Sequence, residues 1–150
     1  MGSKSDWDVM KGAIDILKSF DVENEVKVLS AHRTPHELEK WVSDLRERGF
    51  AAVIAGAGGA AHLAGVVAAF TTLPVIGVPV KGQAFEGLDS LLSMVQMPSG
   101  IPVAVVAVNG SKNAALLAVE IMAVTDNSLK VKMDKFRFEQ AQNVLNSVLS

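Results

Sequence analysis

The clearest indication of the fold class is in residues 51–78, which read AAVIAGAGGAAHLAGVVAAFTTLPVIGV. An apolar run over Ala51–Ala55 is followed by a glycine-rich turn, a stretch of small residues, and a second apolar run over Val75–Val78. Strands that are apolar at nearly every position are typical of a parallel sheet covered on both faces. This stretch therefore predicts a strand, a crossover helix and a parallel neighbouring strand.

The same alternation of strands and helices extends in both directions from this stretch. Further strands are predicted at Glu25–Leu29 and Val103–Val108. A helix is expected from Trp7 to Phe20, after an N-cap at Ser5 or Asp6. Another is expected from Pro35 to about Gly49, after a capping box formed by Thr34 and Glu37. Further helices are expected over Ala60–Phe70, after Gly87, over Asn113–Val124, and from about Ser128 to Leu149. The pattern predicts one α/β domain over 1–150, with an αβα arrangement of three layers.

The composition excludes several classes of protein. The 150-residue chain is 49% hydrophobic, contains no cysteine and has a formal net charge of -2 at pH 7. This charge and the few aromatic residues argue against a surface for nucleic acid or anionic membranes. No apolar run approaches the roughly 20 residues of a membrane helix, and three histidines without any cysteine argue against a zinc site. We expect a cytoplasmic protein without a metal site that buries apolar surface between subunits.

Polar segments follow the predicted strands, at the edge of the sheet where such folds bind ligands. The backbone N–H groups and hydroxyls of Gly2–Asp6 suit a phosphate, and a plain helix cap explains them equally well. Ser30–Pro35 contains His32, which can take and give a proton, and Arg33, whose fork of donors suits a phosphate. The alternative is a loop in which the histidine only hydrogen-bonds to the backbone.

Glycines 56, 58 and 59 form the third such segment. They either let a ligand approach the backbone closely or allow a helix to pack tightly on the sheet. The segment lacks the Gly-Lys-Ser/Thr ending of a Walker loop and the third glycine of a dinucleotide fingerprint. His62 follows near a helix start, where it is either a structural hydrogen-bond partner or part of the site.

Taken together, these segments resemble the PurE family. The motifs that carry the resemblance occur in order along nearly the whole chain: Gly2-Ser3-Lys4-Ser5-Asp6-Trp7, Ser30-Ala31-His32-Arg33-Thr34-Pro35, the Ala55–Leu63 segment, Asp89–Ser93 through Gln96-Met97-Pro98, and Asn113–Leu116. Class I members are N5-carboxyaminoimidazole ribonucleotide mutases of purine (IMP) biosynthesis. The resemblance implies a flavodoxin-like fold, a homo-octamer, and transfer of a carboxyl group from the exocyclic nitrogen of the substrate to C4 without any cofactor.

The resemblance also implies roles for individual residues. His32 would be the acid and base, Ser5, Ser30 and Arg33 would hold the 5′-phosphate, and Asp6 would hold the ribose hydroxyls. Ser3, the backbone of Ala57 and Gly58, and Leu63 would surround the base and the migrating carboxylate, which His62 would help to orient. A direct aminoimidazole ribonucleotide carboxylase, disfavoured by the Gly-Gly-Ala-Ala-His-Leu segment, and a non-catalytic ribonucleotide-binding protein are the alternatives.

The sequence departs from the family pattern at its start. PurE proteins have an apolar strand immediately before the Met-Gly-Ser loop, whereas this sequence starts at Met1, so the N-terminal strand is apparently missing. Because that strand would be central in the sheet, we expect unpaired backbone and exposed apolar surface beside it.

Overall fold

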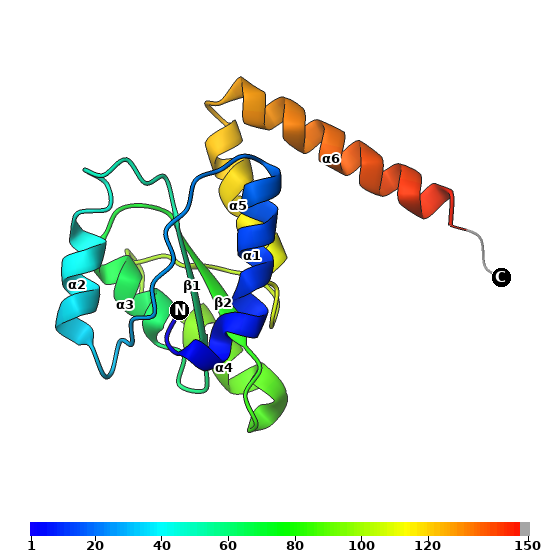
Figure 1. Cartoon of the computed structure of the whole chain (residues 1–150). Helices are drawn as coiled ribbons and strands as arrows, with labels where there is room; N and C mark the ends of the chain where they lie inside the picture. Colours follow the sequence, from blue (N-terminus) through cyan, green and yellow to red (C-terminus); the bar gives the residue numbers. More distant parts are fainter. Residues whose placement is uncertain (148–150) are drawn as a thin grey trace.

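The parallel sheet predicted from the apolar runs is present in the computed structural model of the chain, which describes residues 1–147 (Figure 1). Within those residues the strands are β1 (Val53–Gly58), β2 (Val75–Val80) and β3 (Ala104–Val105), in the order β1-β2-β3. Val53 is aligned with Val75, and Ile76 with Ala104. β2 is buried at every position, because it has a strand on each side and helices on both faces.

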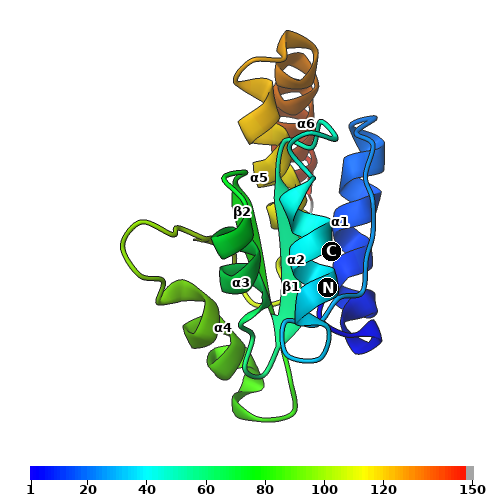
Figure 2. The ribbon, with the colours of Figure 1, turned by 90° about the vertical axis from the view of Figure 1, so that its left-hand side faces the viewer.

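Helices cover both faces of the sheet (Figure 2). Their bounds are α1 (Trp7–Ser19), α2 (Pro35–Ser43), α3 (Leu63–Phe70), α4 (Leu88–Val95), α5 (Ser111–Ala123) and α6 (Asn127–Leu145), with 3-10 turns at Lys4–Asp6 and Phe85–Gly87. Ala55 and Val75 join the core beneath α2 and α3, whereas Ile76 and Val78 join the core beneath α1 and α5. Because alternate strand residues point to opposite faces, the sheet forms the middle layer of a flavodoxin-like αβα fold.

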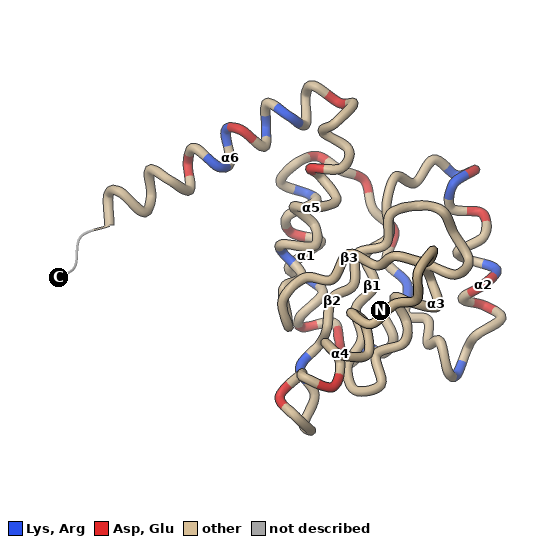
Figure 3. Tube along the Cα trace, turned by 180° about the vertical axis from the view of Figure 1, so that it is seen from behind, with Lys and Arg blue, Asp and Glu red and all other residues tan. Residues whose placement is uncertain are grey.

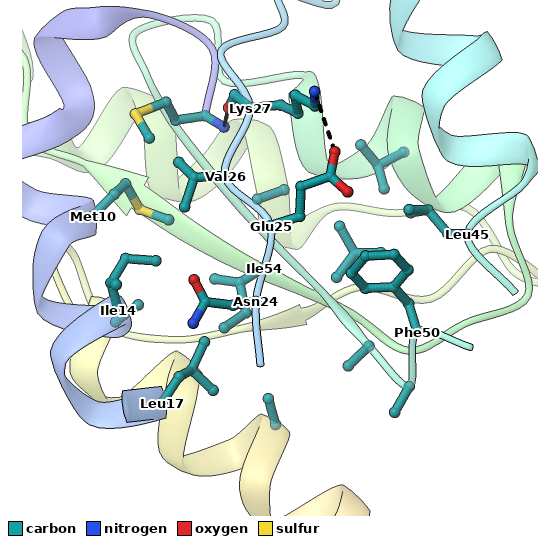
Figure 4. A pocket seen from close by; sticks show the side chains of 18 of the residues that line it. Met10, Ile14, Leu17, Asn24, Glu25, Val26, Lys27, Leu45, Phe50 and Ile54 are labelled. Carbon is teal, nitrogen blue, oxygen red and sulfur yellow. Dashed lines mark hydrogen bonds and ion pairs between the residues drawn. The ribbon is translucent and has the colours of Figure 1, made fainter. Parts of the chain in front are cut away.

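The prediction of a strand at Glu25–Leu29 is wrong. The segment carries no strand, and the N–H groups of residues 23–28 donate no hydrogen bond within the described residues. An apolar cavity of about 390 Å³ separates it from β1 (Figure 4). Strands pair at about 4.8 Å, so this separation prevents a ladder. The unpaired backbone and apolar lining expected beside a missing strand are therefore found here.

Met1 and Gly2 together link the segment Glu25–Leu29 to β1 beside this cavity. The amino group of Met1 donates to the carbonyl of Lys27 at 2.9 Å, and the carbonyl of Met1 accepts from the N–H of Leu29 at 2.9 Å. This is the hydrogen-bond pattern of a parallel bridge. Gly2 N–H continues the link by donating to the carbonyl of Gly56 at 3.0 Å. Burial lowers the pKa of the Met1 amino group, and the nearby Asp6 carboxylate opposes that shift.

Several other boundaries differ from the prediction. β1 extends through Gly58, so two of the glycines assigned to a loop belong to the strand, and β3 covers only two of the residues expected over Val103–Val108. The helix expected from Ala60 begins at Leu63. The capping box at Thr34 is wrong, because its hydroxyl exchanges hydrogen bonds with the backbone of Ser30 instead.

The last helix projects away from the body of the molecule (Figure 1). α6 ends at Leu145, and the predicted end at Leu149 lies outside the described residues. Cationic and anionic side chains are interspersed along its first part (Figure 3), and its apolar Phe138 is 64% exposed. Within the described chain, no helix is both long and apolar enough to cross a membrane.

Candidate active site

A cavity of about 650 Å³ lies where β1 and β2 end. The three predicted segments meet there, and the lining includes every residue to which the sequence assigned a role: Ser3, Ser5, Asp6, Ser30, His32, Arg33, Ala57, Gly58, His62 and Leu63. They meet because the carboxyl ends of parallel strands open to the same edge of the sheet. The volume is that of a small-molecule site. Its lining combines hydroxyl, carboxylate, imidazole and guanidinium groups, whereas the lining of the 390 Å³ cavity beside Glu25–Leu29 does not combine them.

Asp6 occupies the predicted N-cap position of α1 without capping it through its side chain, and Ser3 caps the 3-10 turn that precedes it. The Ser3 hydroxyl accepts from the N–H of Ser5 at 3.3 Å, and Asp6 Oδ2 accepts from the N–H of Ser3 at 2.9 Å. This reciprocal capping box fixes the turn and buries the Asp6 carboxylate, which is 6% exposed. Its second oxygen, Oδ1, has only a long contact of 3.5 Å with the Ser5 hydroxyl. That oxygen retains acceptor capacity for a ligand.

Arg33 connects the second segment to the N-terminal turn. Its Nε donates to the Ser30 hydroxyl at 3.3 Å, and its Nη2 donates to the carbonyl of Gly2 at 3.2 Å. The N–H of Arg33 also donates to the same Ser30 hydroxyl, at 3.2 Å. These bonds hold the guanidinium at the cavity before any ligand arrives, and its exposed position leaves donors for an anion.

His32 contacts His62 rather than the backbone. Nε2 of His32 lies 2.9 Å from Nδ1 of His62, and the two rings meet edge to face with centroids 5.0 Å apart. His62 occupies the N-cap position of α3 without capping it through its side chain. The interpretation of the His32 loop as one whose imidazole only bonds the backbone is therefore wrong.

The glycines of the third segment serve different purposes. A side chain at Gly56 would overlap Sδ of Met10, so this glycine lets α1 pack closely on β1. Val53 donates its N–H to Pro74 on the β2 side, and backbone groups alternate along a strand. Ala57 therefore directs its N–H toward β2, whereas the N–H of Gly58 points away from β2, toward the N-terminal turn. Of these two backbones, only that of Gly58 is free to donate to a ligand.

The cavity also has a side that the sequence did not predict in detail. Lys81, Gln83 and Asn109 line it, and the Asn109 side-chain oxygen accepts from the N–H of Lys81 at 2.9 Å. Lys81 also forms an ion pair with Glu86. Position was the available signal for both: Lys81 directly follows β2, and Asn109 directly follows the strand predicted over Val103–Val108.

Residues near α4 do not join this lining. The Ser90 hydroxyl is fully buried and donates to the carbonyls of Val80 and Gly87, at 3.0 and 2.9 Å. Neither Asp89 nor the segment 96–98 reaches the cavity. In the part of the chain that the structure describes, no three histidine, aspartate or glutamate side chains lie close enough to hold a metal ion.

Comparison with known proteins gives consistent matches. The family model described as AIR carboxylase matches residues 1–143. N5-carboxyaminoimidazole ribonucleotide mutase of Vibrio vulnificus is 55% identical, over 97% of this chain and 91% of that protein. Phosphoribosylaminoimidazole carboxylase of Saccharomyces cerevisiae is also 55% identical, over 97% of this chain but 25% of that protein. The crystal structure of Treponema denticola PurE superposes with a TM-score of 0.86 and 29% identity, covering 97% of this chain and 90% of that one.

Proposed function

The chain belongs to the AIR carboxylase family, and on that premise we propose how its cavity carries out the N5-carboxyaminoimidazole ribonucleotide mutase reaction. This reaction of purine biosynthesis moves a carboxyl group from the exocyclic nitrogen of the ribonucleotide to C4 of its imidazole ring. The observation that carries the proposal is the convergence of His32, Arg33 and Gly58 on one cavity of about 650 Å³.

The anionic end of the substrate binds at the second segment. Arg33 and the hydroxyls of Ser5 and Ser30 hold the 5′-phosphate, because a guanidinium with adjacent hydroxyls supplies several convergent donors. Asp6 accepts hydrogen bonds from the ribose hydroxyls through its less occupied Oδ1. The ribose therefore lies between the phosphate site and the ends of the strands.

The imidazole base and its carboxylate bind beside Ser3, Ala57, Gly58 and Leu63. The N–H of Gly58 donates to the carboxylate as a neutral group, so it orients this anion without a full positive charge that would trap it. Leu63 and the Ala57 methyl supply apolar walls, both being buried. Apolar walls at this end of the cavity keep released carbon dioxide next to C4.

His32 transfers the protons. It donates one to the exocyclic nitrogen, whose bond to the carboxyl carbon breaks to release carbon dioxide. The electron-rich C4 then attacks that carbon dioxide, and the proton on C4 returns to His32, so the imidazole ends as it began. One group can serve both steps because an ordinary imidazole gives and takes protons near neutral pH.

The second candidate is a direct carboxylase that uses aminoimidazole ribonucleotide and carbon dioxide. The similarity to the S. cerevisiae protein, which carries the carboxylase name, is the specific observation in its favour. It uses the same cavity and differs only in the source of the carboxyl group.

Two reactions with the purified chain distinguish these candidates. One contains N5-carboxyaminoimidazole ribonucleotide without bicarbonate, and the other contains aminoimidazole ribonucleotide with bicarbonate. Rapid formation of the C4-carboxylated product in the first reaction alone is expected. Product in the second alone would identify a carboxylase, and no product in either from folded protein would indicate a non-catalytic ribonucleotide-binding protein.

The active form is proposed to be a cytoplasmic homo-octamer. Its support is apolar surface that one chain leaves uncovered: Leu88 and Leu92 on α4 are about half exposed, and Phe138 on the projecting α6 is 64% exposed. Sedimentation should give a mass several times the 15.8 kDa of one chain; a monomer at micromolar concentration would refute the assembly.

A further inference from the structure

The contact between His32 and His62 restricts where protons can sit. A ring nitrogen either carries a hydrogen and donates, or presents a lone pair and accepts. At the 2.9 Å that separates Nε2 of His32 from Nδ1 of His62, only one hydrogen can lie between them. Two lone pairs would repel, and two N–H groups would collide. The hydrogen bond between the two rings can therefore run in either direction, from His32 to His62 or from His62 to His32. Each direction fixes the tautomer of the ring that accepts.

The proposed reaction distinguishes these two directions. When His32 collects the proton from C4 it becomes an imidazolium, in which both nitrogens carry hydrogen. Its Nε2 must then donate, so the facing Nδ1 of His62 must be the acceptor. If His62 donated instead, the contact would break each time His32 became charged. Only the direction from His32 to His62 is compatible with every state of the cycle.

We propose that His62 is a positioning residue that holds His32 in the tautomer with hydrogen on Nε2, so that Nδ1 of His32 is the atom that exchanges protons with the substrate. Nδ1 of His32 makes no hydrogen bond within the described residues, and the ring is exposed at the cavity. As the acceptor, His62 carries its own hydrogen on Nε2. This role presupposes the mutase reaction proposed above, and it differs from a direct contact between His62 and the migrating carboxylate.

The surrounding charges are compatible with a neutral acceptor. The charged side chains that line the same cavity are Asp6, Arg33 and Lys81. Asp6 is engaged with Ser3, and Lys81 is paired with Glu86. No carboxylate in the described chain hydrogen-bonds to either imidazole, and His62 is the hydrogen-bond partner of the His32 ring there.

Two substitutions at His62 separate the positioning role from a purely structural one. His62→Phe keeps a ring of similar size but removes the acceptor, whereas His62→Asn places an amide oxygen close to where Nδ1 lies. His62 is exposed and makes no cap bond through its side chain, so both variants should fold. His36→Phe is the matched control, because His36 is exposed on α2 and lies outside the cavity.

The first readout is the tautomer of His32, observed in long-range ¹H–¹⁵N spectra of the ring without substrate. Wild type and His62→Asn should show hydrogen on Nε2 of His32, and His62→Phe should show a mixture of tautomers. The second readout is mutase kinetics. Because positioning is part of the roughly 10²- to 10⁴-fold that acid–base catalysis supplies, His62→Phe should lower kcat about 10- to 100-fold with little change in KM, and His62→Asn should recover most of it.

The outcomes separate this inference from the function on which it builds. Unchanged tautomer and unchanged kcat in His62→Phe would overturn the positioning role while leaving the mutase intact. A rise in KM alone, equal in the Phe and Asn variants, would also overturn it and would indicate direct contact with substrate. An inactive wild type would refute the function, whatever the spectra show.

Discussion

Replacing Gly56 with alanine should destabilise the fold, although this glycine lies in the segment that resembles a ligand-binding loop. A Cβ built at this position would overlap Sδ of Met10 and lie 3.0 Å from both Cγ and Cε of that residue. Met10 is 6% exposed and belongs to the core beneath α1 and α5, and its flexible side chain also lines the apolar cavity of about 390 Å³ (Figure 4). The clash is relieved by a new rotamer of Met10 or by a shift of α1, so the cost should lie toward the lower end of the range for overpacking.

The size of the effect follows from the cost of adding one methyl group to a packed core. Such overpacking typically costs about 1–3 kcal/mol, which for a chain of this length lowers the melting temperature by roughly 2–12 °C. Urea unfolding followed by circular dichroism measures the change. Wild type and variant must be compared at equal protein concentration, because assembly makes the apparent stability concentration-dependent.

A double-mutant cycle tests the stated cause. Met10→Ala removes the clashing atoms at its own cost of about 2–5 kcal/mol, and in that background Gly56→Ala should cost much less than in wild type. Gly2→Ala is the control, since its Cβ would meet nothing closer than 3.6 Å. Equal costs of Gly56→Ala in both backgrounds, or no cost in either, would refute packing against Met10 as the reason for this glycine.

Three further predictions concern binding, pH and the apolar cavity. Arg33→Ala should raise KM about 10- to 100-fold, because a charged hydrogen bond is worth about 1.5–3 kcal/mol, with Arg33→Lys between it and wild type; an unchanged KM in steady-state kinetics would exclude Arg33 from phosphate binding. The N–H groups of Leu129 and Ser128 lower the pKa of Asp126, so its carboxylate stabilises α6 above the ordinary carboxyl pKa and that stabilisation is lost as pH falls below about 4. Asp126→Asn should reduce the loss of the helical circular dichroism signal over this pH range. Identical pH titrations of wild type and variant would contradict the capping role of Asp126. Adding about five apolar, β-branched residues before Met1, to match the segment Glu25–Leu29 that lines the 390 Å³ cavity, should raise the melting temperature above that of an equally long Gly-Ser extension. Equal melting temperatures would mean that the cavity does not accept a strand.

Local patterns in the sequence were sufficient for most of the fold. Val75–Val78 could be predicted as a buried strand because a run that is apolar at nearly every position needs cover on both faces, and β2 is buried at every position in the structure. His32 and Arg33 line the cavity as predicted, although the strand expected before them does not form, because Met1 holds the end of that segment in place through Lys27 and Leu29. Such inferences succeed because strand burial and the polarity of strand ends depend on neighbours along the chain.

Other features depended on contacts between segments distant in sequence. The segment Glu25–Leu29 has the composition of a strand, but strand formation requires a partner within hydrogen-bonding distance, and an apolar cavity lies where that partner would be. Gly56 has the appearance of a loop residue, and its role became clear only from the position of Met10 on α1. The sequence shows His32 and His62 as two separate histidines, thirty residues apart. Only the tertiary fold, by bringing the starts of α2 and α3 to one edge of the sheet, places their ring nitrogens close enough to share a single hydrogen.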